Sequence, residues 1–134
     1  MVIDSSALAA ILLAEPERHR FNMLIDKDRV RLLSAATLVE ISVVIEARKG
    51  ELGLREFDLL IRLAQVEIVS VTLEQAHIAR SAYRKFGKGR QAAGLNFGDC
   101  FSYAPAKATG EPLLCKGAEF AKTDLSLADT APDS

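Results

Sequence analysis

Short apolar runs alternate with helical patterns along the whole chain, and this alternation restricts the fold more than any other feature of the sequence. The apolar runs lie at residues 1–4, 31–35, 66–71 and 111–117, and helical spacing or capping residues separate each run from the next. Parallel strands need such crossover helices, whereas antiparallel strands can be joined by tight turns. The sequence therefore predicts an α/β fold in which helices cover both faces of a central parallel sheet of about four to five strands.

The length and the cysteine content fit a single intracellular domain. A chain of 134 residues can bury a sizeable core without disulfide bonds or a structural metal. We assign residues 1–127 to the domain and 128–134 to a polar tail, which we expect to be disordered. Cys100 and Cys115 fit no metal-ligand spacing and are interpreted as reduced packing residues. No export signal precedes the first apolar run and no stretch could span a bilayer, so we expect a soluble cytoplasmic protein without membrane association.

Three carboxylates occupy positions that solubility does not explain. Asp4 ends the first apolar run, and Asp99 follows a glycine where a loop becomes a helix. Glu40 lies within 37–47, a helical segment that is apolar nearly all round and is expected to be packed on most of its surface. We hypothesise that the fold brings the three together, because ligands of parallel sheets bind beyond the carboxyl ends of the strands. Clustered carboxylates repel one another, and a hard divalent cation removes that penalty.

Simpler roles for the same carboxylates stay open at the level of sequence. Asp4 can serve as the cap of the helix that follows it. Glu40 lies inside a helix, so capping does not explain it, but a structural salt bridge would. A non-catalytic interaction module would use the acids in these ways alone.

Basic residues are concentrated in one interval of an otherwise balanced chain. The net charge of −1 excludes a globally basic nucleic-acid binder, yet no acidic residue lies between Glu74 and Asp99. An ordinary solvated helix face is the simplest explanation. The alternative is a surface that contacts the phosphates of a nucleic acid, and its candidate residues are Arg84, Lys85, Lys88 and Arg90.

Four separated segments together resemble one known family. The segments 4–8, 36–40, 95–100 and 116–124 look like the motifs of the PIN-domain ribonuclease toxins of the VapC type, in order and over nearly the whole chain. The resemblance implies a small PIN-like three-layer sandwich that binds Mg²⁺ or Mn²⁺ and cleaves RNA endonucleolytically. It also implies the toxin of a type II toxin–antitoxin pair, with a cognate antitoxin as partner and a homodimeric state.

The resemblance also assigns roles to individual residues. The first three acids of the family fall on Asp4, Glu40 and Asp99, with Asp4 and Asp99 as metal ligands and Glu40 as ligand or water-positioning base. The fourth acid of the family is commonly an aspartate, whereas this chain offers Glu119 as a catalytic residue or Asp124 as a metal ligand. The hydroxyl groups expected to orient carboxylates are those of Ser6 and Thr123.

One residue departs from the pattern of the family. Pro105 lies inside the helix predicted after Asp99, where a proline costs about 3 kcal/mol because it removes a hydrogen bond and clashes with the preceding turn. The sequence leaves three outcomes open, namely a kinked helix, a helix in two pieces or an impaired protein.

The sequence gives less support to a second chemistry for the acidic site, phosphoryl transfer. An α/β phosphoryl-transfer domain would also use a pocket of acids, but Asp4 lacks the second aspartate two residues on that phosphatases of that kind use.

Overall fold

The computed structural model describes residues 1–89 and 92–130 and contains four parallel strands in one sheet. The strands are β1 (Val2–Ile3), β2 (Leu32–Ser34), β3 (Glu67–Val69) and β4 (Leu113–Leu114). Their order across the sheet is β3-β2-β1-β4, and every neighbouring pair is parallel. The predicted α/β class and the parallel sheet are therefore confirmed.

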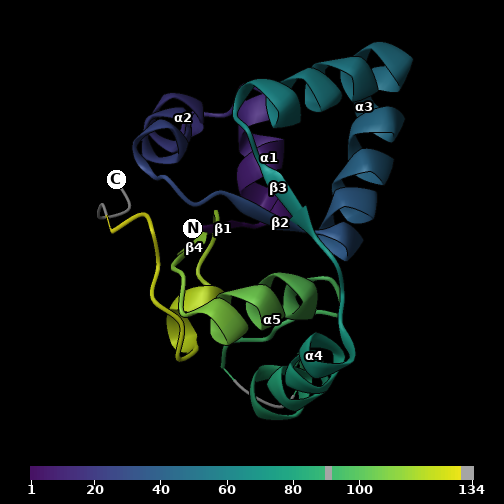
Figure 1. The fold of residues 1–134 in the computed structure, drawn as a ribbon. Coiled ribbons are helices and arrows are strands. Elements are labelled where there is room, and N and C mark those ends of the chain that lie inside the picture. The colour runs from purple at the N-terminus through teal and green to yellow at the C-terminus, as the bar shows by residue number, and fades with distance from the viewer. Residues whose placement is uncertain (90–91, 131–134) are drawn as a thin grey trace.

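Helices cover both faces of this sheet, as Figure 1 shows. They are α1 (Ser5–Leu12), α2 (Arg18–Lys27), α3 (Ala35–Leu63), α4 (Leu73–Phe86) and α5 (Asp99–Thr109), followed by the short 3₁₀ helix η1 (Phe120–Lys122). The first three lie on one side of the sheet and α4 and α5 on the other, which gives the three-layer sandwich. None of the helices in the described part of the chain is long and apolar enough to cross a membrane.

The alternation of side chains along each strand divides the core into two halves. Ile3, Leu33 and Leu114 pack in the half that contains α1, α2 and α3. The preceding residues of the same strands, Val2, Leu32 and Leu113, pack in the half formed with α4 and α5. Successive residues of a strand point to opposite faces, so strands of two or three residues suffice to join both layers.

The long helix α3 consists of two helical halves that meet at Gly50. This glycine has φ 65° and ψ −159°, a conformation that residues with a Cβ rarely adopt. Arg48 and Lys49 directly precede Gly50, a sequence typical of a helix end, and the chain changes direction sharply here. Figure 1 shows the two halves running at a wide angle to each other.

The first half of α3 is less buried than the sequence predicts. Ile41 and Ile45 are buried, but Val39 and Val43 are each 62% exposed and Val44 is 38% exposed. The prediction that this helix is packed on most of its surface is therefore wrong. One side of α3 packs on α1 and the sheet, and no described element covers the other. An all-round apolar helix can also indicate an association surface.

The helix α5 is a single helix from Asp99 to Thr109 and contains Pro105 in its interior. The proline ring is buried, and Gly110 ends the helix in the left-handed conformation with φ 76°. Of the three outcomes left open by the sequence, the division into two helices is excluded.

The packed part of the chain continues beyond residue 127. The N–H of Ala128 donates to the carbonyl of Leu113, and the N–H of Leu113 donates to the carbonyl of Ser126, so this segment runs beside β4. The carboxylate of Asp129 pairs with Arg20 of α2 at 2.8 Å. The start of the predicted tail is thus held against α2 and β4, whereas residues 131–134 lie outside the described part.

Candidate active site

The order of the strands places a switch point of the winding between β1 and β4. The chain proceeds outward from β1 through β2 to β3, and then returns to the other side of β1 to form β4. Ligands of open parallel sheets bind where the direction of winding reverses in this way. Asp4 follows β1 directly and Glu119 follows β4 by a short loop, so both lie at this switch point.

Asp4 is buried and is held by three hydrogen bonds. Its Oδ2 accepts from the backbone N–H of Ser6 at 3.1 Å and from the Ser6 hydroxyl at 2.6 Å, and its Oδ1 accepts from Ser102 at 2.5 Å. The Ser6 hydroxyl also accepts from the backbone N–H of Lys116 at 2.9 Å, which joins the end of β4 to this carboxylate. Asp4 therefore caps α1, as the simpler interpretation held, and its carboxylate is held in one orientation at the switch point at the same time.

Asp99 begins α5 and is positioned by Asn96. The Asp99 Oδ2 accepts from the backbone N–H of Asn96 at 3.0 Å, and the Asn96 Oδ1 accepts from the backbone N–H of Asp99 at 2.9 Å. This reciprocal pair across three residues resembles a capping box. It fixes the start of the helix and the carboxylate together.

Glu40 reaches the same place from α3. Its carboxylate lies against Gly98, so closely that a Cβ at residue 98 would collide with Oε2. Gly98 has φ −63° and ψ −39°, an ordinary helical conformation. The glycine is therefore needed for the close approach of Glu40 and not for its backbone angles.

The charges of these acids act on one another. Burial is the main cause that raises the pKa of Asp99 to about 6, and the carboxylates of Asp4, Glu119 and Glu40 raise it further. The pKa of the Cys115 thiol rises to about 12 through burial and through Asp4 and Glu119 among nearby acids. Four carboxylates from four separate segments thus share one electrostatic neighbourhood.

The chemistry of this donor set fits a hard divalent cation. Carboxylate oxygens are the ligands of Mg²⁺, which keeps several of its waters and needs only one or two carboxylates. Within residues 1–89 and 92–130, no three acidic, cysteine or histidine side chains converge closely enough to bind a metal ion directly. The arrangement therefore suits an ion held by one or two carboxylates, with the remaining acids acting through water.

Asp124 and Thr123 lie in a different setting from the one the sequence suggested. The Asp124 carboxylate accepts from Tyr103 at 2.7 Å and from Lys107 at 2.8 Å, and these partners lower its pKa. It is not among the groups that raise the pKa of Asp99, unlike Glu119. The Thr123 hydroxyl donates to the carbonyl of Phe120 and accepts from the N–H of Leu125, so it orders the turn after η1. It forms no hydrogen bond with a carboxylate of the described residues.

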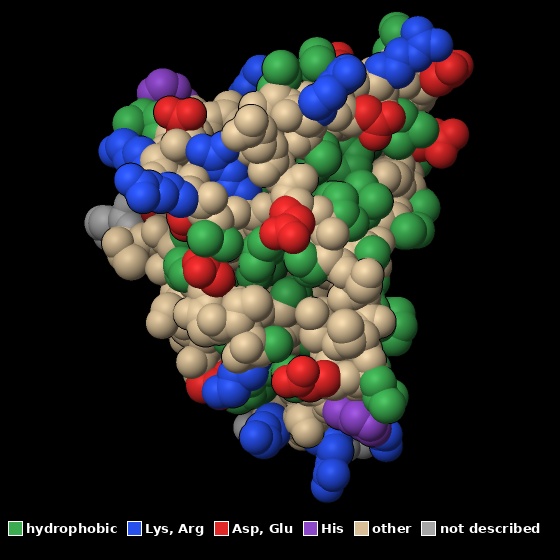
Figure 2. All heavy atoms as spheres, in the orientation of Figure 1, with side chains coloured by type: hydrophobic (Ala, Val, Ile, Leu, Met, Phe, Trp, Pro, Cys, Tyr) green, Lys and Arg blue, Asp and Glu red, His purple; other side chains and the backbone are tan. Residues whose placement is uncertain are grey.

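The basic candidates lie on and after α4, on the other side of the sheet from α1. Arg84 and Lys85 are exposed on different sides of that helix, Lys88 is exposed just beyond its end, and Arg90 lies outside the described residues. Figure 2 shows Lys and Arg side chains gathered over this end of the molecule. Basic charge is therefore present beside the layer that carries Asp99.

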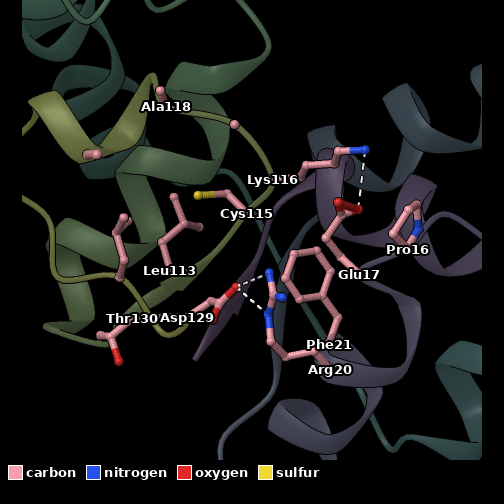
Figure 3. A pocket seen from close by; sticks show the side chains of 13 residues that line it. Pro16, Glu17, Arg20, Phe21, Leu113, Cys115, Lys116, Ala118, Asp129 and Thr130 are labelled. Carbon is pink, nitrogen blue, oxygen red and sulfur yellow. Dashed lines mark hydrogen bonds and ion pairs between the residues drawn. The ribbon is translucent and has the colours of Figure 1, made fainter. Parts of the chain in front are cut away.

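A cavity of about 750 Å³ lies between α2 and the segment that follows β4. Figure 3 shows Cys115 in its wall, with Lys116 paired to Glu17 on one side and Arg20 paired to Asp129 on another. Because Lys116 also contacts Glu15 at 2.6 Å, its ammonium group is already neutralised locally.

Two positioning residues were not found from the sequence. Ser102 is fully buried and its hydroxyl donates to Asp4. The Thr37 hydroxyl oxygen lies 3.5 Å from that of Ser102. Nothing in the local pattern distinguishes Ser102 from an ordinary core residue of α5. Asn96 could have been identified, because an asparagine three residues before an aspartate at a helix start is a capping signal.

Known proteins resemble this chain over nearly its whole length. Residues 1–125 match the family described as PIN domain. A VapC ribonuclease of Mycobacterium bovis, Mb0640, is 53% identical over 126 residues, which cover 94% of this chain and 96% of that protein. A ribonuclease VapC of Mycolicibacterium smegmatis is 52% identical over 94% of this chain and 98% of its own length.

Solved structures share the fold at low sequence identity. The crystal structure of Mycobacterium tuberculosis VapC20, described as a Sarcin-Ricin loop cleaving toxin, has a TM-score of 0.74 and 20% identity and covers 92% of this chain and 95% of its own. VapBC2 of Rickettsia felis, bound to a promoter DNA fragment, has a TM-score of 0.72 and 16% identity, with coverage of 94% and 95%.

Proposed function

Because this chain belongs to the PIN domain family, whose pattern spans residues 1–125, we propose that it is a metal-dependent endoribonuclease and the toxin of a type II toxin–antitoxin pair. Relatives that are more than half identical over nearly the whole chain are named VapC ribonucleases. The reaction is hydrolysis of an RNA phosphodiester bond by water.

One observation carries this proposal. Glu40 lies against Gly98, the residue before Asp99, and Asp4 accepts a hydrogen bond from Ser102 in the helix that Asp99 begins. Together with Glu119, these carboxylates raise the pKa of Asp99, although the four residues come from separate segments. A cluster of like charges at the switch point of the sheet is costly unless a cation or a proton neutralises it. A domain that used its acids only as helix caps or in salt bridges would have no reason to gather them.

Different residues of the chain have different roles in the proposed hydrolysis. Mg²⁺ or Mn²⁺, when bound, would lower the pKa of a water molecule and neutralise charge on the scissile phosphate. Asp4 supplies a rigid ligand, because its three hydrogen bonds hold both carboxylate oxygens. Asp99, fixed by Asn96, supplies the second ligand. Glu40 would accept the proton of the attacking water, and the exposed Glu119 would orient water around the ion.

The experiment that tests the proposal compares two glutamate substitutions on the same helix. Purified protein is incubated with total RNA, with and without Mg²⁺, and cleavage is followed for the parent, Glu40→Gln and Glu46→Gln. Glu46 is exposed on α3 and forms no ion pair with a described residue, so it is the matched control. We expect Mg²⁺-dependent cleavage by the parent and Glu46→Gln and its loss in Glu40→Gln. Cleavage by all three proteins at equal rates, or by none of them, would contradict the proposal. If calorimetric titration also detects no binding of Mg²⁺, the protein is a non-catalytic module.

The partners follow from the same proposal. An antitoxin would place a basic side chain among the acids and thereby replace the neutralising cation. A second copy of the chain would cover the exposed valine stripe of α3, formed by Val39, Val43 and Val44. A contiguous exposed apolar surface of this kind marks an association site in soluble proteins.

A further inference from the structure

A second cavity lies next to the acidic cluster, between α4 and the start of α5. Its volume is about 480 Å³, within the range of about 300–1,000 Å³ that is usual for pockets that bind small molecules. The lining residues are small, aromatic or basic, and they are Ala76, Ala79, Arg80, Tyr83, Arg84, Phe97, Cys100 and Phe101. The walls of this α4–α5 cavity therefore combine apolar rings with two guanidinium groups.

The aromatic side chains of the cavity are unusually accessible. Phe97 is 77% exposed and Tyr83 is 41% exposed. The rings of Phe97 and Phe101 meet edge to face, with centroids 5.0 Å apart and an angle of 75° between their planes. An exposed phenylalanine held by a second ring offers a flat apolar surface for another ring system.

The charges at the cavity favour an anionic ligand. Arg80 and Arg84 are both exposed, and neither guanidinium forms an ion pair with any residue in the described ranges. Glu74 is the last acidic residue before Asp99, so the sequence between them adds no competing negative charge. A protein surface that packed here would have to bury two unpaired cations, which costs free energy.

Residues that line the α4–α5 cavity are close neighbours, in the sequence, of residues of the acidic cluster. Phe97 and Phe101 flank Asp99 in the sequence, and Gly98 lies against the carboxylate of Glu40. A single strand of RNA with its scissile phosphate at the acids would thus have a neighbouring nucleotide within reach of the aromatic walls.

We propose that the α4–α5 cavity is a stacking subsite for one base of single-stranded RNA beside the scissile phosphate. The base lies on the ring of Phe97, and Arg80 and Arg84 contact the adjoining phosphates. Aromatic and guanidinium planes bind unstacked bases in this way, and the binding tolerates different sequences because every base has a π face. This inference depends on the proposed ribonuclease function.

The test separates recognition of bases from attraction of the backbone. Binding is measured in the cleavage-deficient Asp99→Asn background with two probes, a short single-stranded RNA and a ribose-phosphate oligomer of equal length without bases. The variants are Phe97→Ala and the matched control Leu52→Ala, a side chain 71% exposed on α3. Light scattering reports the oligomeric state of each.

We expect Phe97→Ala to weaken binding of the RNA by about 5- to 150-fold, the usual effect of removing one stacked base. Its affinity for the base-free oligomer and the affinities of Leu52→Ala should stay at the values of the background protein. Equal loss for both probes, or no loss for the RNA, would overturn the subsite. A shift of Phe97→Ala to a smaller assembly with unchanged RNA affinity would also overturn it, because a second copy of the chain would then occupy the cavity. If the background protein binds neither probe while the parent fails to cleave RNA, the proposed function itself fails.

Discussion

The surroundings of Asp99 have opposite effects on the pKa of its carboxyl group. Burial and three neighbouring carboxylates raise its pKa to about 6, while the N–H of Asn96 acts in the opposite direction. A carboxyl group whose pKa is higher in the folded than in the unfolded state binds protons on folding. The free energy of unfolding of the metal-free protein therefore falls as pH rises from about 4 to about 6, and this penalty is complete above about pH 6.

The first prediction follows from that sign. Asp99→Asn should raise the melting temperature of the metal-free protein at about pH 7.5, and the gain should shrink as pH is lowered towards 4, where the parent is protonated too. Mg²⁺ should stabilise the parent and have little effect on the variant, because the ligand is lost. Thermal melts at both pH values, with and without Mg²⁺, check this. A gain of equal size at both pH values would contradict the assignment of the pKa.

Gly98 allows a second prediction that separates activity from stability. A Cβ at residue 98 would displace the carboxylate of Glu40, and the flexible end of that side chain moves at little cost. Alanine also suits the helical backbone at this position better than glycine, which favours the folded state by about 0.4–1 kcal/mol. Gly98→Ala should therefore lower RNA cleavage at least about tenfold, in line with loss of a positioned base, without loss of stability.

The double variant supplies the control for this prediction. If Gly98→Ala acts through Glu40, combining it with Glu40→Gln should add little to the loss caused by Glu40→Gln alone. Independent, multiplying losses would show that Gly98 acts by another route.

At the level of residues, the sequence identifies the acids better than the groups that position them. Asp4, Glu40 and Asp99 stand out because their charges follow or interrupt apolar patterns. Ser102 carries no such mark, since a serine inside an amphipathic helix is common and its hydrogen bond to Asp4 spans 98 positions. Contacts of that length depend on how α5 lies against β1, which local patterns do not encode.

Among the elements, α5 is destabilised by the proline in its interior, and a single substitution should remove this destabilisation. The helix is continuous through Pro105, so the Phe101 carbonyl lacks the N–H partner that another residue at position 105 would provide. Proline costs about 3 kcal/mol relative to alanine inside a helix, whereas the buried ring atoms lost in Pro105→Ala are worth about 1.6 kcal/mol.

The third prediction is therefore a net stabilisation of about 1 kcal/mol in Pro105→Ala. Urea unfolding of the parent, Pro105→Ala and Pro16→Ala measures it. Pro16 precedes α2 in a loop, so its substitution should bring no gain. A destabilised Pro105→Ala would show that packing of the ring outweighs the helix penalty.

The helix α3 leads to a fourth prediction about assembly. Val43 is 62% exposed in the middle of the valine stripe, and a homodimer that covers the stripe would bury it. Val43→Glu should then convert the dimer to a monomer, because a charge would be desolvated at the interface. Size exclusion with light scattering provides the measurement, with Leu52→Glu on the second half of α3 as control. Equal masses for the parent and Val43→Glu would place any dimer contact elsewhere.

The same helix explains which part of the fold is predictable. The alternation of strands and helices identifies the parallel sheet, and basic residues before Gly50 mark the break in α3. Periodicity alone does not distinguish a helix buried within one chain from a helix that associates with another, since both are apolar on several sides. The exposure of Val39 and Val43 was therefore accessible only from the packing of the whole domain.

Over the whole molecule, the net charge is only −1, yet one cluster of carboxylates and one group of basic side chains lie in different places. Asp4, Glu40, Asp99 and Glu119 lie at the switch point of the sheet, and α4 presents basic side chains. A polyanion would be drawn to the basic end and would meet the acids only through a bound cation. Association with RNA should therefore depend on salt through the basic residues and on metal through the acids.

The last prediction tests this division. In the Asp99→Asn background, Lys85→Gln with Lys88→Gln should weaken RNA binding about equally for different sequences and reduce the slope of log affinity against log salt by about 1.4, two charges at about 0.7 each for single strands. The paired control is Arg55→Gln with Arg62→Gln on the second half of α3, on the opposite side of the sheet from α4 (Figure 1). Mg²⁺ affinity measured by calorimetry in the parent background should be nearly unchanged by the lysine pair, since exposed charges are screened over about 8–10 Å. An unchanged salt slope would mean that Lys85 and Lys88 do not contact the RNA backbone.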